Sequence, residues 1–286
     1  GVRRASGLSD MIAEIDPACF DVWRKALSRT RRKQMAPARA VDAVEAGVRE
    51  PIEKAKIICR QIFLEVRESR EARALRHVFF AERAASATSQ LGSVPSPEVK
   101  TVAVVGAGAM GAGIAMCFAN AGIPVTLLDT SQENVERGLA SIRRNYGLSV
   151  SKRKMSERAV AECMGLIRGG VEYADIGDVD LAIEAVFEDL EIKKQVFRQL
   201  DAVCRDNAIL ATNTSYLNIN EIAGATNRPE NVIGLHFFNP AHIMKLLEII
   251  RCENTSDEVL RSCLEVSRRL RKTGVVSGVC FGFIGN

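Results

Sequence analysis

The feature that most limits how this chain can fold is a glycine-rich stretch directly after a short apolar run. Residues 101–113 read TVAVVGAGAMGAG and place Gly106, Gly108 and Gly111 in the spacing G-x-G-x-x-G. Glycine-rich turns are common, but this one follows a strand-like run and opens an alanine-rich, helix-like segment. In that context the glycines serve a tight turn, the approach of a pyrophosphate to the backbone, and close packing of helix on strand.

The chain beyond residue 99 continues this alternation of strand and helix. Its strand-like runs are apolar throughout, which is typical of parallel strands covered by helices on both faces. The pattern predicts an α/β fold, a Rossmann-type doubly wound parallel sheet, over residues 99–280. The strand-like runs are 101–105, 125–129, 180–186, 208–212, 232–237 and 245–250, and the helix-like segments are 109–121, 131–147, 189–203 and 256–271.

An acidic residue ends the second strand-like run. Asp129 lies 18 residues beyond Gly111, where a carboxylate would accept hydrogen bonds from the ribose diol of an adenosine. The following residues 130–134, TSQEN, contain no arginine to receive a 2′-phosphate, and Asp129 would repel one. The sequence therefore predicts NAD, in preference to NADP, as the cofactor. The alternative is a glycine turn beside an incidental acid.

The residues before the glycine motif follow a different pattern, with one helix-like segment after another. Apolar residues recur at three- and four-residue spacing, which predicts amphipathic helices. Two stripes are visible: Ala55, Ile58, Ile62 and Val66 in the first, and Leu75, Val78 and Phe79 in the second. A small, polar stretch with two prolines follows. We expect a helical segment over residues 1–86 and a linker over residues 87–98.

The basic residues are concentrated in this first part of the chain. Residues 1–98 hold 18 Lys and Arg against 13 Asp and Glu, a net charge of +5, so the remainder contributes about −1 to the overall +4. The excess could mark a surface for phosphates or nucleic acid, or a solvated helical surface. The absence of interleaved aromatic residues favours the second interpretation, and we expect no nucleic-acid partner.

Composition excludes several other classes of protein. The eight cysteines are scattered without a C-x-x-C pair or a Cys/His cluster, so we expect reduced thiols and no metal site. No run approaches the roughly 18 apolar residues of a membrane span, and the first residues lack the apolar core of a signal peptide. At 47% hydrophobic and 26% charged residues, the chain has an ordinary globular composition.

One histidine and one glutamate stand out opposite the predicted cofactor site. Of the three histidines, His236 ends the strand-like run NVIGLHF, and ligands bind at the carboxyl ends of such strands. Twelve residues later Glu248 interrupts the apolar run LLEII, where a lone carboxylate would be costly to bury. The two residues could form an acid–base pair. They could equally be a satisfied core histidine and a surface glutamate on an edge strand.

Several stretches of the chain resemble the L-3-hydroxyacyl-CoA dehydrogenases of fatty-acid β-oxidation. The resemblance is nearest to the multifunctional type, in which an enoyl-CoA hydratase/isomerase precedes the dehydrogenase. The HFFNP stretch with the MKLLE that follows it is highly specific, whereas the glycine motif is not. The matching stretches are VGAGAMGAGIA, IEAVFEDLEIKKQVF, ATNTSYL, IGLHFFNPAHIMKLLEII, GFIGN and, for the connecting segment, REARALRHVFFAERAA.

The resemblance implies roles for individual catalytic residues. His236 would be the catalytic base and Glu248 its orienting partner. Ser215 would hydrogen-bond the 3-oxygen of the substrate and lie close to the nicotinamide, while Asn286 would contact the substrate from the other side. Ser215 could instead be a helix N-cap ahead of LNINEIA.

The resemblance also implies a set of cofactor-binding residues. Beside the three glycines, Met110 and Asp129 would line the adenosine half of NAD, and Asn239 would contact the cofactor near His236. Lys193 could instead be a solvated helix residue. The residues expected around the nicotinamide ribose are Val186, Phe187, Glu188 and Lys193.

The implied reaction is the NAD-dependent oxidation of an L-3-hydroxyacyl-CoA to the 3-ketoacyl-CoA. Residues 1–86 would be the end of a hydratase-like domain with its connecting helix, and residues 281–286 the start of a helical C-terminal domain. We therefore expect this chain to bind NAD but to be poorly active alone. A related dehydrogenase of free hydroxy acids or sugar acids and a non-catalytic NAD-binding scaffold remain alternatives.

The expected partners and location also follow from the resemblance. The substrate would be an acyl-CoA, and a thiolase subunit is a possible partner in the parent complex. The location would be the cytoplasm in a bacterium or the peroxisome in a eukaryote.

Overall fold

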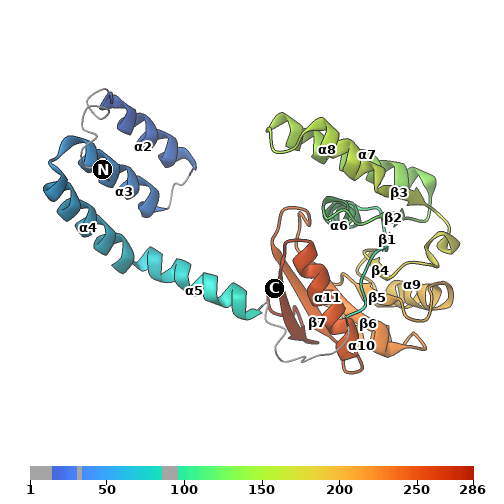
Figure 1. Ribbon diagram of the computed structural model, residues 1–286. Helices are drawn as coiled ribbons and strands as arrows, with labels where there is room; N and C mark the ends of the chain where they lie inside the picture. The colour runs from blue at the N-terminus through green and yellow to red at the C-terminus, as the bar shows by residue number, and fades with distance from the viewer. Residues whose placement is uncertain (1–14, 31–33, 86–95) are drawn as a thin grey trace, which may run out of the picture. The chain divides into compact units, whose positions relative to one another are not determined.

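A computed structural model describes residues 15–30, 34–85 and 96–286 (Figure 1). The chain divides into two compact units, Gly1–Arg83 and Ala84–Asn286. The linker expected over residues 87–98 lies largely outside the described residues. The domain boundaries expected at 1–86, 87–98, 99–280 and 281–286 stay predictions.

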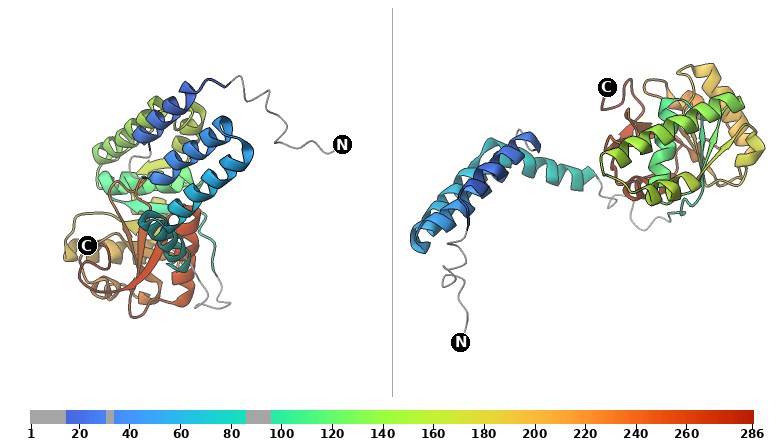
Figure 2. Two further views of the ribbon diagram at one scale, coloured as in Figure 1. Left: turned by 90° about the vertical axis from the view of Figure 1, so that its left-hand side faces the viewer. Right: turned by 90° about the horizontal axis from the view of Figure 1, so that it is seen from above.

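The first unit is helical. Helices α2, α3 and α4 lie side by side in sequence order, as the views of Figure 2 show. Ion pairs link them: Arg24 of α2 contacts Asp42 of α3 at 2.7 Å and also pairs with Glu45, while Arg39 of α3 pairs with Glu65 of α4. The helices are α2 (Ala18–Thr30), α3 (Met35–Arg49), α4 (Ile52–Glu68) and α5 (Arg70–Ala85).

The two predicted apolar stripes behave differently. On α4, Ala55 is buried and the other three stripe residues are partly covered, so this prediction is confirmed. On α5 the expected stripe of Leu75, Val78 and Phe79 is about half exposed, and α5 buries none of its residues. Among the described residues, none of the helices of this unit covers the second stripe as α3 covers α4, so the stripe is not a packed helix face there.

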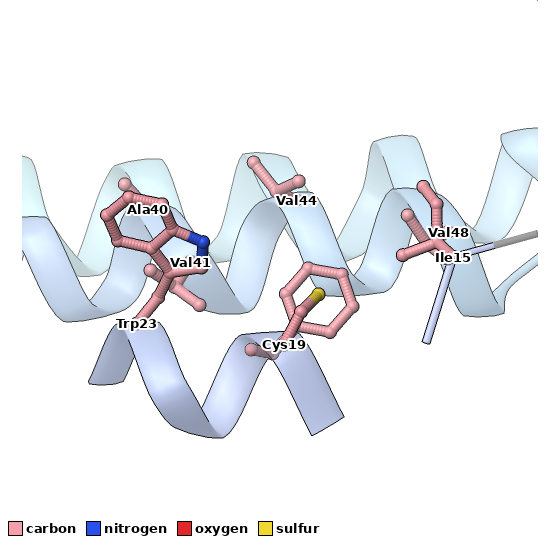
Figure 3. A pocket seen from close by; sticks show the side chains of 8 residues that line it. Ile15, Cys19, Trp23, Ala40, Val41, Val44 and Val48 are labelled. Atoms are coloured by element: carbon pink, nitrogen blue, oxygen red, sulfur yellow. The ribbon is translucent and has the colours of Figure 1, made fainter. Parts of the chain in front are cut away.

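An apolar groove lies between α2 and α3. Cys19 and Trp23 of α2 face Val41 and Val44 of α3 across it (Figure 3). Trp23 and Val44 remain about 60% exposed, so the groove opens to solvent.

The second unit is built on one eight-stranded sheet with the order β3-β2-β1-β4-β5-β6-β7-β8. All neighbouring strands are parallel except β6 and β7, which run antiparallel. The doubly wound parallel sheet is thus confirmed, with this one antiparallel pair as the departure from it. The strands are β1 (Val102–Val105), β2 (Val125–Leu128), β3 (Ile167–Gly170), β4 (Leu181–Glu184), β5 (Ile209–Thr212), β6 (Val232–Phe237), β7 (Leu246–Arg251) and β8 (Thr273–Gly278).

Helices cover both faces of this sheet. Successive side chains of β1 point to opposite faces, so Val102 and Val104 belong to the apolar layer that includes α6, α7 and α11, while Ala103 and Val105 belong to the layer that includes α9 and α10. The two apolar layers explain why the strands read as continuous apolar runs. The helices are α6 (Ala109–Asn120), α7 (Gln132–Ser151), α8 (Glu157–Gly165), α9 (Leu190–Val203), α10 (Ile219–Ala223) and α11 (Asp257–Arg269), with 3-10 turns η3 (Tyr173–Ile176) and η4 (Pro229–Asn231).

Helix α9 is held at both ends by side chains. At its start Asp189 accepts a hydrogen bond from the backbone N–H of Ile192 at 3.0 Å. At its end the guanidinium of Arg228 donates to the carbonyls of Asp201 and Cys204 at 3.1 and 3.0 Å, and its Nε lies 2.9 Å from a carboxylate oxygen of Asp201. Arg228 thereby satisfies carbonyl groups that have no partner within a helix.

The order of the strands fixes where a ligand can bind. The chain leaves β1 towards β2 and β3 on one side, and then returns to β4 on the other side of β1. A crevice forms beyond the carboxyl ends of the strands at such a reversal, and ligands bind there in open α/β sheets. The glycine turn after β1 and the residues after β4 and β5 therefore meet at one edge.

Candidate active site

The glycine turn after β1 has two positions that allow no side chain. Gly106 has φ of +106°, and a Cβ there would lie 2.6 Å from the carbonyl oxygen of Ala185. A Cβ on Gly111 would lie 1.7 Å from the carbonyl oxygen of Gly106. These two glycines are required by the turn itself and by the packing of α6 against β1.

Gly108 differs from both. It begins α6 as its N-cap, and a Cβ added there would meet no atom within 4 Å. The first N–H groups of a helix have no partner within the helix, and the helix dipole places partial positive charge at this end. Open space in front of a twelve-residue helix therefore fits a pyrophosphate, so the residues present fit a dinucleotide.

Asp129, at the end of β2, is tied to the glycine turn. One carboxylate oxygen accepts the backbone N–H of Ala107 at 2.7 Å, and the other accepts Asn134 Nδ2 at 2.7 Å and the N–H of Thr130 at 2.8 Å. Burial raises the pKa of Asp129, but these hydrogen bonds outweigh burial and hold it below its ordinary value. The carboxylate is thus ionised beside the turn, where it would repel a 2′-phosphate.

His236 and Glu248 stand directly opposite each other on β6 and β7. Their side chains meet with 2.7 Å between Nδ1 of His236 and Oε2 of Glu248. An ionised carboxylate only accepts hydrogen bonds, so the proton of the neutral imidazole resides on Nδ1 and leaves Nε2 as the basic nitrogen. Glu248 is fully buried, and β7 lies between β6 and β8. The alternative of a surface glutamate on an edge strand is therefore wrong.

The second carboxylate oxygen of Glu248 binds the end of the chain. Oε1 accepts the backbone N–H groups of Ile284 at 2.9 Å and Gly285 at 2.8 Å. A Cβ on Gly285 would lie 2.6 Å from the ring of Phe238, so this segment packs closely over that ring. Glu248 thus fixes both the imidazole and the residues directly before Asn286. Asn286 itself is exposed.

Aromatic rings enclose the imidazole. The ring centroids of Phe238 and Phe283 lie 4.5 and 5.7 Å from that of His236, which is 4% exposed. Nε2 of His236 faces the hydroxyl of Ser215 at 3.2 Å. The arrangement is a largely dry Ser215–His236–Glu248 chain in which one imidazole nitrogen is available for proton transfer.

Ser215 lies in the loop that follows β5, and Glu188 holds that loop. Oε1 of Glu188 accepts the backbone N–H groups of Ser215 at 2.8 Å and Tyr216 at 3.2 Å, and the hydroxyl of Thr214. Burial raises the pKa of Glu188, but the hydrogen bonds from Thr214 and Ser215, together with Lys193, hold it below its ordinary value. The N-cap of α10 is Asn218, so the alternative role of Ser215 as that cap is wrong.

Lys193 is a buried residue. Its side chain is 1% exposed and contacts Glu184 at 2.7 Å and Glu188 at 3.3 Å. The alternative of a solvated helix residue is therefore wrong. A buried ammonium needs charged partners, and the two carboxylates supply them.

The remaining expected site residues lie around this centre. Met110, in the first turn of α6, is partly buried against the core, and Val186 donates its backbone N–H to Glu184 at 2.7 Å. Phe187 is 82% exposed, and Asn239 and Asn286 are also exposed. Phe187 directly precedes Glu188, Asn239 follows β6 with His236, and Asn286 follows the segment that Glu248 binds. The roles of these three exposed residues stay predictions.

Sequence reasoning missed Glu184, Thr212, Thr214 and Asn213. Glu184 is a fully buried carboxylate in the apolar run LAIEAV, which is the same signal that singled out Glu248. Asn213 accepts the backbone N–H of Phe237 through its side chain at 2.8 Å and so joins the Ser215 loop to β6. No signal in the sequence distinguishes Asn213 and the two threonines from ordinary polar loop residues.

The fold and site define a dinucleotide-binding domain of the Rossmann class with an acid–base pair at its crevice. Residues 101–280 match the family described as "3-hydroxyacyl-CoA dehydrogenase, NAD binding domain". The chain belongs to this 3-hydroxyacyl-CoA dehydrogenase family, and the cofactor of the matched domain is NAD.

Individual relatives agree with this assignment. The chain is 39% identical to the peroxisomal bifunctional enzyme of Cavia porcellus over 280 residues, covering 93% of this chain and 38% of that protein. It is 34% identical to the fatty acid oxidation complex subunit alpha of Psychrobacter arcticus, covering 88% of this chain and 35% of that protein. The chain thus spans less than two fifths of the length of these relatives.

A solved structure shows the same fold. The (S)-3-hydroxybutyryl-CoA dehydrogenase of Ralstonia eutropha superimposes with a TM-score of 0.65 at 35% identity. The superposition covers 66% of this chain and 67% of that chain.

Within the part of the chain that the structure describes, no three His, Cys, Asp or Glu side chains gather as a metal site would require. None of its helices combines the length and the apolar character needed to cross a membrane.

Proposed function

We propose that the whole protein oxidises L-3-hydroxyacyl-CoA to 3-ketoacyl-CoA with NAD, and that this chain carries the cofactor site and the acid–base pair. The observation that carries the proposal is the hydrogen-bonded chain from Ser215 Oγ through the imidazole of His236 to Glu248, at 3.2 and 2.7 Å. This chain of hydrogen bonds supports a site at which the hydroxyl group of a substrate gives its proton to Nε2 of His236.

In the proposed reaction, Nε2 of His236 accepts the proton of the C3 hydroxyl. NAD, when bound, supplies the acceptor for the hydride that leaves C3. Glu248 keeps the imidazole in the tautomer whose Nε2 is free, and its negative charge stabilises the imidazolium that forms. In the reverse direction the imidazolium returns the proton to the oxygen of the ketone.

Other side chains would place the substrate oxygen. The hydroxyl of Ser215 is close enough to Nε2 to hydrogen-bond the same oxygen, and Asn286 would approach from the segment that Glu248 holds. Proton transfer by a positioned base contributes about 10²–10⁴-fold to the rate, and orientation supplies a further part.

The residues proposed to hold NAD lie along the crevice. The turn of Gly106, Gly108 and Gly111 would receive the pyrophosphate, and Asp129 the adenosine ribose. Around the nicotinamide ribose we place Val186, Phe187, Glu188 and Lys193, with Met110 on the adenosine side and Asn239 near His236. The fit of a pyrophosphate before Gly108 supports this arrangement.

The partners and location of the whole protein are part of the proposal. The name "bifunctional" of the Cavia porcellus relative supports a second activity, enoyl-CoA hydration, in the parent chain. An acyl-CoA is the proposed substrate and a thiolase subunit the proposed partner. The relatives are peroxisomal in eukaryotes and a complex subunit in a bacterium, which supports the peroxisome or the bacterial cytoplasm, respectively.

Two measurements test the proposal. Titration with NADH should show saturable binding to the wild type and to the His236→Ala variant. Oxidation of NADH that depends on acetoacetyl-CoA, measured in the whole protein, should fall about 10²-fold or more in that variant. Equal rates in both proteins would remove His236 from the mechanism. Turnover of free 3-hydroxybutyrate instead of its CoA thioester would favour a dehydrogenase of free hydroxy acids.

A further inference from the structure

Glu184 is a fully buried carboxylate that the reaction above does not use. It ends β4, next to Val105 of β1 and Thr212 of β5 in the sheet, beneath the crevice. Its Oε1 accepts Lys193 Nζ at 2.7 Å, and its Oε2 accepts the hydroxyl of Thr212 at 2.7 Å. Because no part of it reaches the surface, Glu184 cannot touch a substrate or cofactor.

Lys193, the charged partner of Glu184, connects it to a second carboxylate nearer the surface. The ammonium group of Lys193 lies 2.7 Å from the carboxylate of Glu184 and 3.3 Å from that of Glu188. Glu184 therefore fixes the ammonium group, and the ammonium group in turn restrains Glu188. Side-chain exposure rises along this series from 0% at Glu184 and 1% at Lys193 to 39% at Glu188.

Glu188 ends the series on the loop that carries Ser215. It accepts two backbone N–H groups and one hydroxyl from residues 214–216, so a shift of its carboxylate moves the whole loop. The hydroxyl of Ser215 lies 3.2 Å from Nε2 of His236, a distance at which a displacement of 1 Å breaks the hydrogen bond.

Stability alone does not account for a buried ion pair at this place. Desolvation of two charges offsets most of their attraction, and apolar side chains of similar volume often stabilise a protein as well or better. An ion pair, unlike an apolar pair, holds charged groups at fixed positions. The pair of Glu184 and Lys193 lies at the crevice end of β4, where such placement matters.

We propose that Glu184 is a positioning residue, which sets the hydroxyl of Ser215 against Nε2 of His236 by way of Lys193 and Glu188. Its meaning for catalysis rests on the proposed dehydrogenase function. The geometric claim itself concerns only this chain, and a measurement without substrate can test it.

The test compares single and double replacements. Glu184→Gln leaves Lys193 buried with one carboxylate, whereas Glu184→Gln with Lys193→Met removes both charges and preserves folding if the pair only fills space. Asp201→Asn is the matched control, because Asp201 of α9 also pairs with a buried cation, Arg228, but lies at the opposite end of the helix from Lys193. Thermal unfolding reports the stability of each variant.

The readout is the imidazole nitrogen resonance of His236. The chain has three histidines, so ¹⁵N-histidine labelling gives few signals, and the His236→Gln variant assigns this one. We expect the double variant to fold with near wild-type stability and to shift the Nε2 resonance as Ser215→Ala does, while Asp201→Asn leaves it in place. In the whole protein, kcat of Glu184→Gln, which keeps the proposed cofactor residue Lys193, should fall about 10²-fold, as for a misplaced reacting group.

The outcomes separate this proposal from the proposed function. A folded double variant with an unchanged Nε2 resonance would make Glu184 purely structural, whatever the kcat of that variant. If the double variant does not fold, Glu188→Ala, which removes every acceptor of the loop at a partly exposed position, must shift the resonance, and an unchanged resonance overturns the proposal. If the wild type has no dehydrogenase activity, the resonance still decides the geometric claim.

Discussion

Nδ1 of His236 and Oε2 of Glu248 lie 2.7 Å apart because antiparallel strands β6 and β7 place the two residues directly opposite each other. The contact therefore depends on the backbone hydrogen bonds of two interior strands and not on flexible loops. We expect Glu248→Gln to lower kcat of the whole protein at least about 10²-fold, since the amide cannot stabilise the imidazolium.

The same substitution should leave NADH binding nearly unchanged, because Glu248 is buried behind the imidazole. The carbonyl oxygen of a glutamine can still accept the N–H groups of Ile284 and Gly285, so the variant should fold. Steady-state kinetics with acetoacetyl-CoA and a fluorescence titration with NADH would check both expectations. Full activity of Glu248→Gln would contradict the proposed role of this carboxylate.

Two substitutions in the glycine turn should separate an effect on NADH binding from an effect on folding. Gly108→Ala should fold with a loss below about 1 kcal/mol, since its Cβ meets no protein atom, but should weaken NADH binding about tenfold or more. Gly111→Ala should destabilise the fold by about 1–3 kcal/mol or more, because its Cβ would overlap the carbonyl of Gly106. Thermal unfolding and NADH titration of the two variants give the comparison. Unchanged affinity in Gly108→Ala would place the pyrophosphate elsewhere.

Asp129 should determine the choice between NAD and NADP. Its carboxylate is held ionised by hydrogen bonds from the glycine turn and from Asn134. We expect Asp129→Ser to lower the affinity for NADH about tenfold, because a charged hydrogen bond is worth about 1.5–3 kcal/mol, and to improve NADPH binding. Competitive titration with both nucleotides measures the change. An unaltered preference would show that another group discriminates between them.

Acid should weaken the fold through Asp129 and Glu188. The folded-state pKa of each carboxyl lies below its ordinary value of 3.8 or 4.5, so each stabilises the folded state above about pH 4 to 5. This contribution is lost as the pH falls through the lowered folded-state values. The stability difference between the wild type and Glu188→Gln, followed by chemical unfolding at pH 7 and pH 3, should therefore shrink on acidification. A constant difference would contradict the lowered pKa.

Arg228 should be a major source of stability for α9. Its guanidinium is 10% exposed and pairs with Asp201 while donating to the carbonyls at the end of the helix. We expect Arg228→Met to lower the free energy of unfolding by about 3 kcal/mol, since it removes the charged partner of a buried carboxylate, which keeps only the hydrogen bonds from Asn227, and leaves the helix carbonyls without donors. The control is Arg205→Met, because Arg205 pairs with Asp180 at a partly exposed site and should cost at most about 1 kcal/mol. Equal effects in urea unfolding would contradict the special position of Arg228.

Much of the sheet could be predicted from the sequence, because buried parallel strands are unbroken apolar runs. Strand β3 escaped prediction, since its sequence IRGG has a single apolar residue. Strand β8, TGVVSG, has only two apolar residues, and two of its other residues are glycines. Both form because they add to the edge of an existing sheet, and sequence patterns do not show that support.

The direction of β7 could have been predicted but was not. Only residues 238–245 separate β6 from β7. A parallel connection needs a dozen or more residues, so this short one requires an antiparallel pair. The short connection also explains why the residues twelve positions apart become direct neighbours.

The site was predictable where its residues carry a pattern of their own. A carboxylate within an apolar run indicated Glu248, and the same criterion would have found Glu184. The backbone hydrogen bonds of Glu188 to the Ser215 loop depend on how two strand ends meet in space. No spacing in the sequence encodes such a contact.

The fastening of α9 at both ends has a consequence for motion. A helix with Lys193 bound to Glu184 near its start and Arg228 bound at its end cannot rock or slide without opening buried polar contacts. Amide hydrogens in its middle should therefore exchange only through rare, large-scale opening. Rapid local fluctuation should be confined to the exposed turn at Phe187, so the crevice would adapt to its ligands through this turn while the helix behind it stays still.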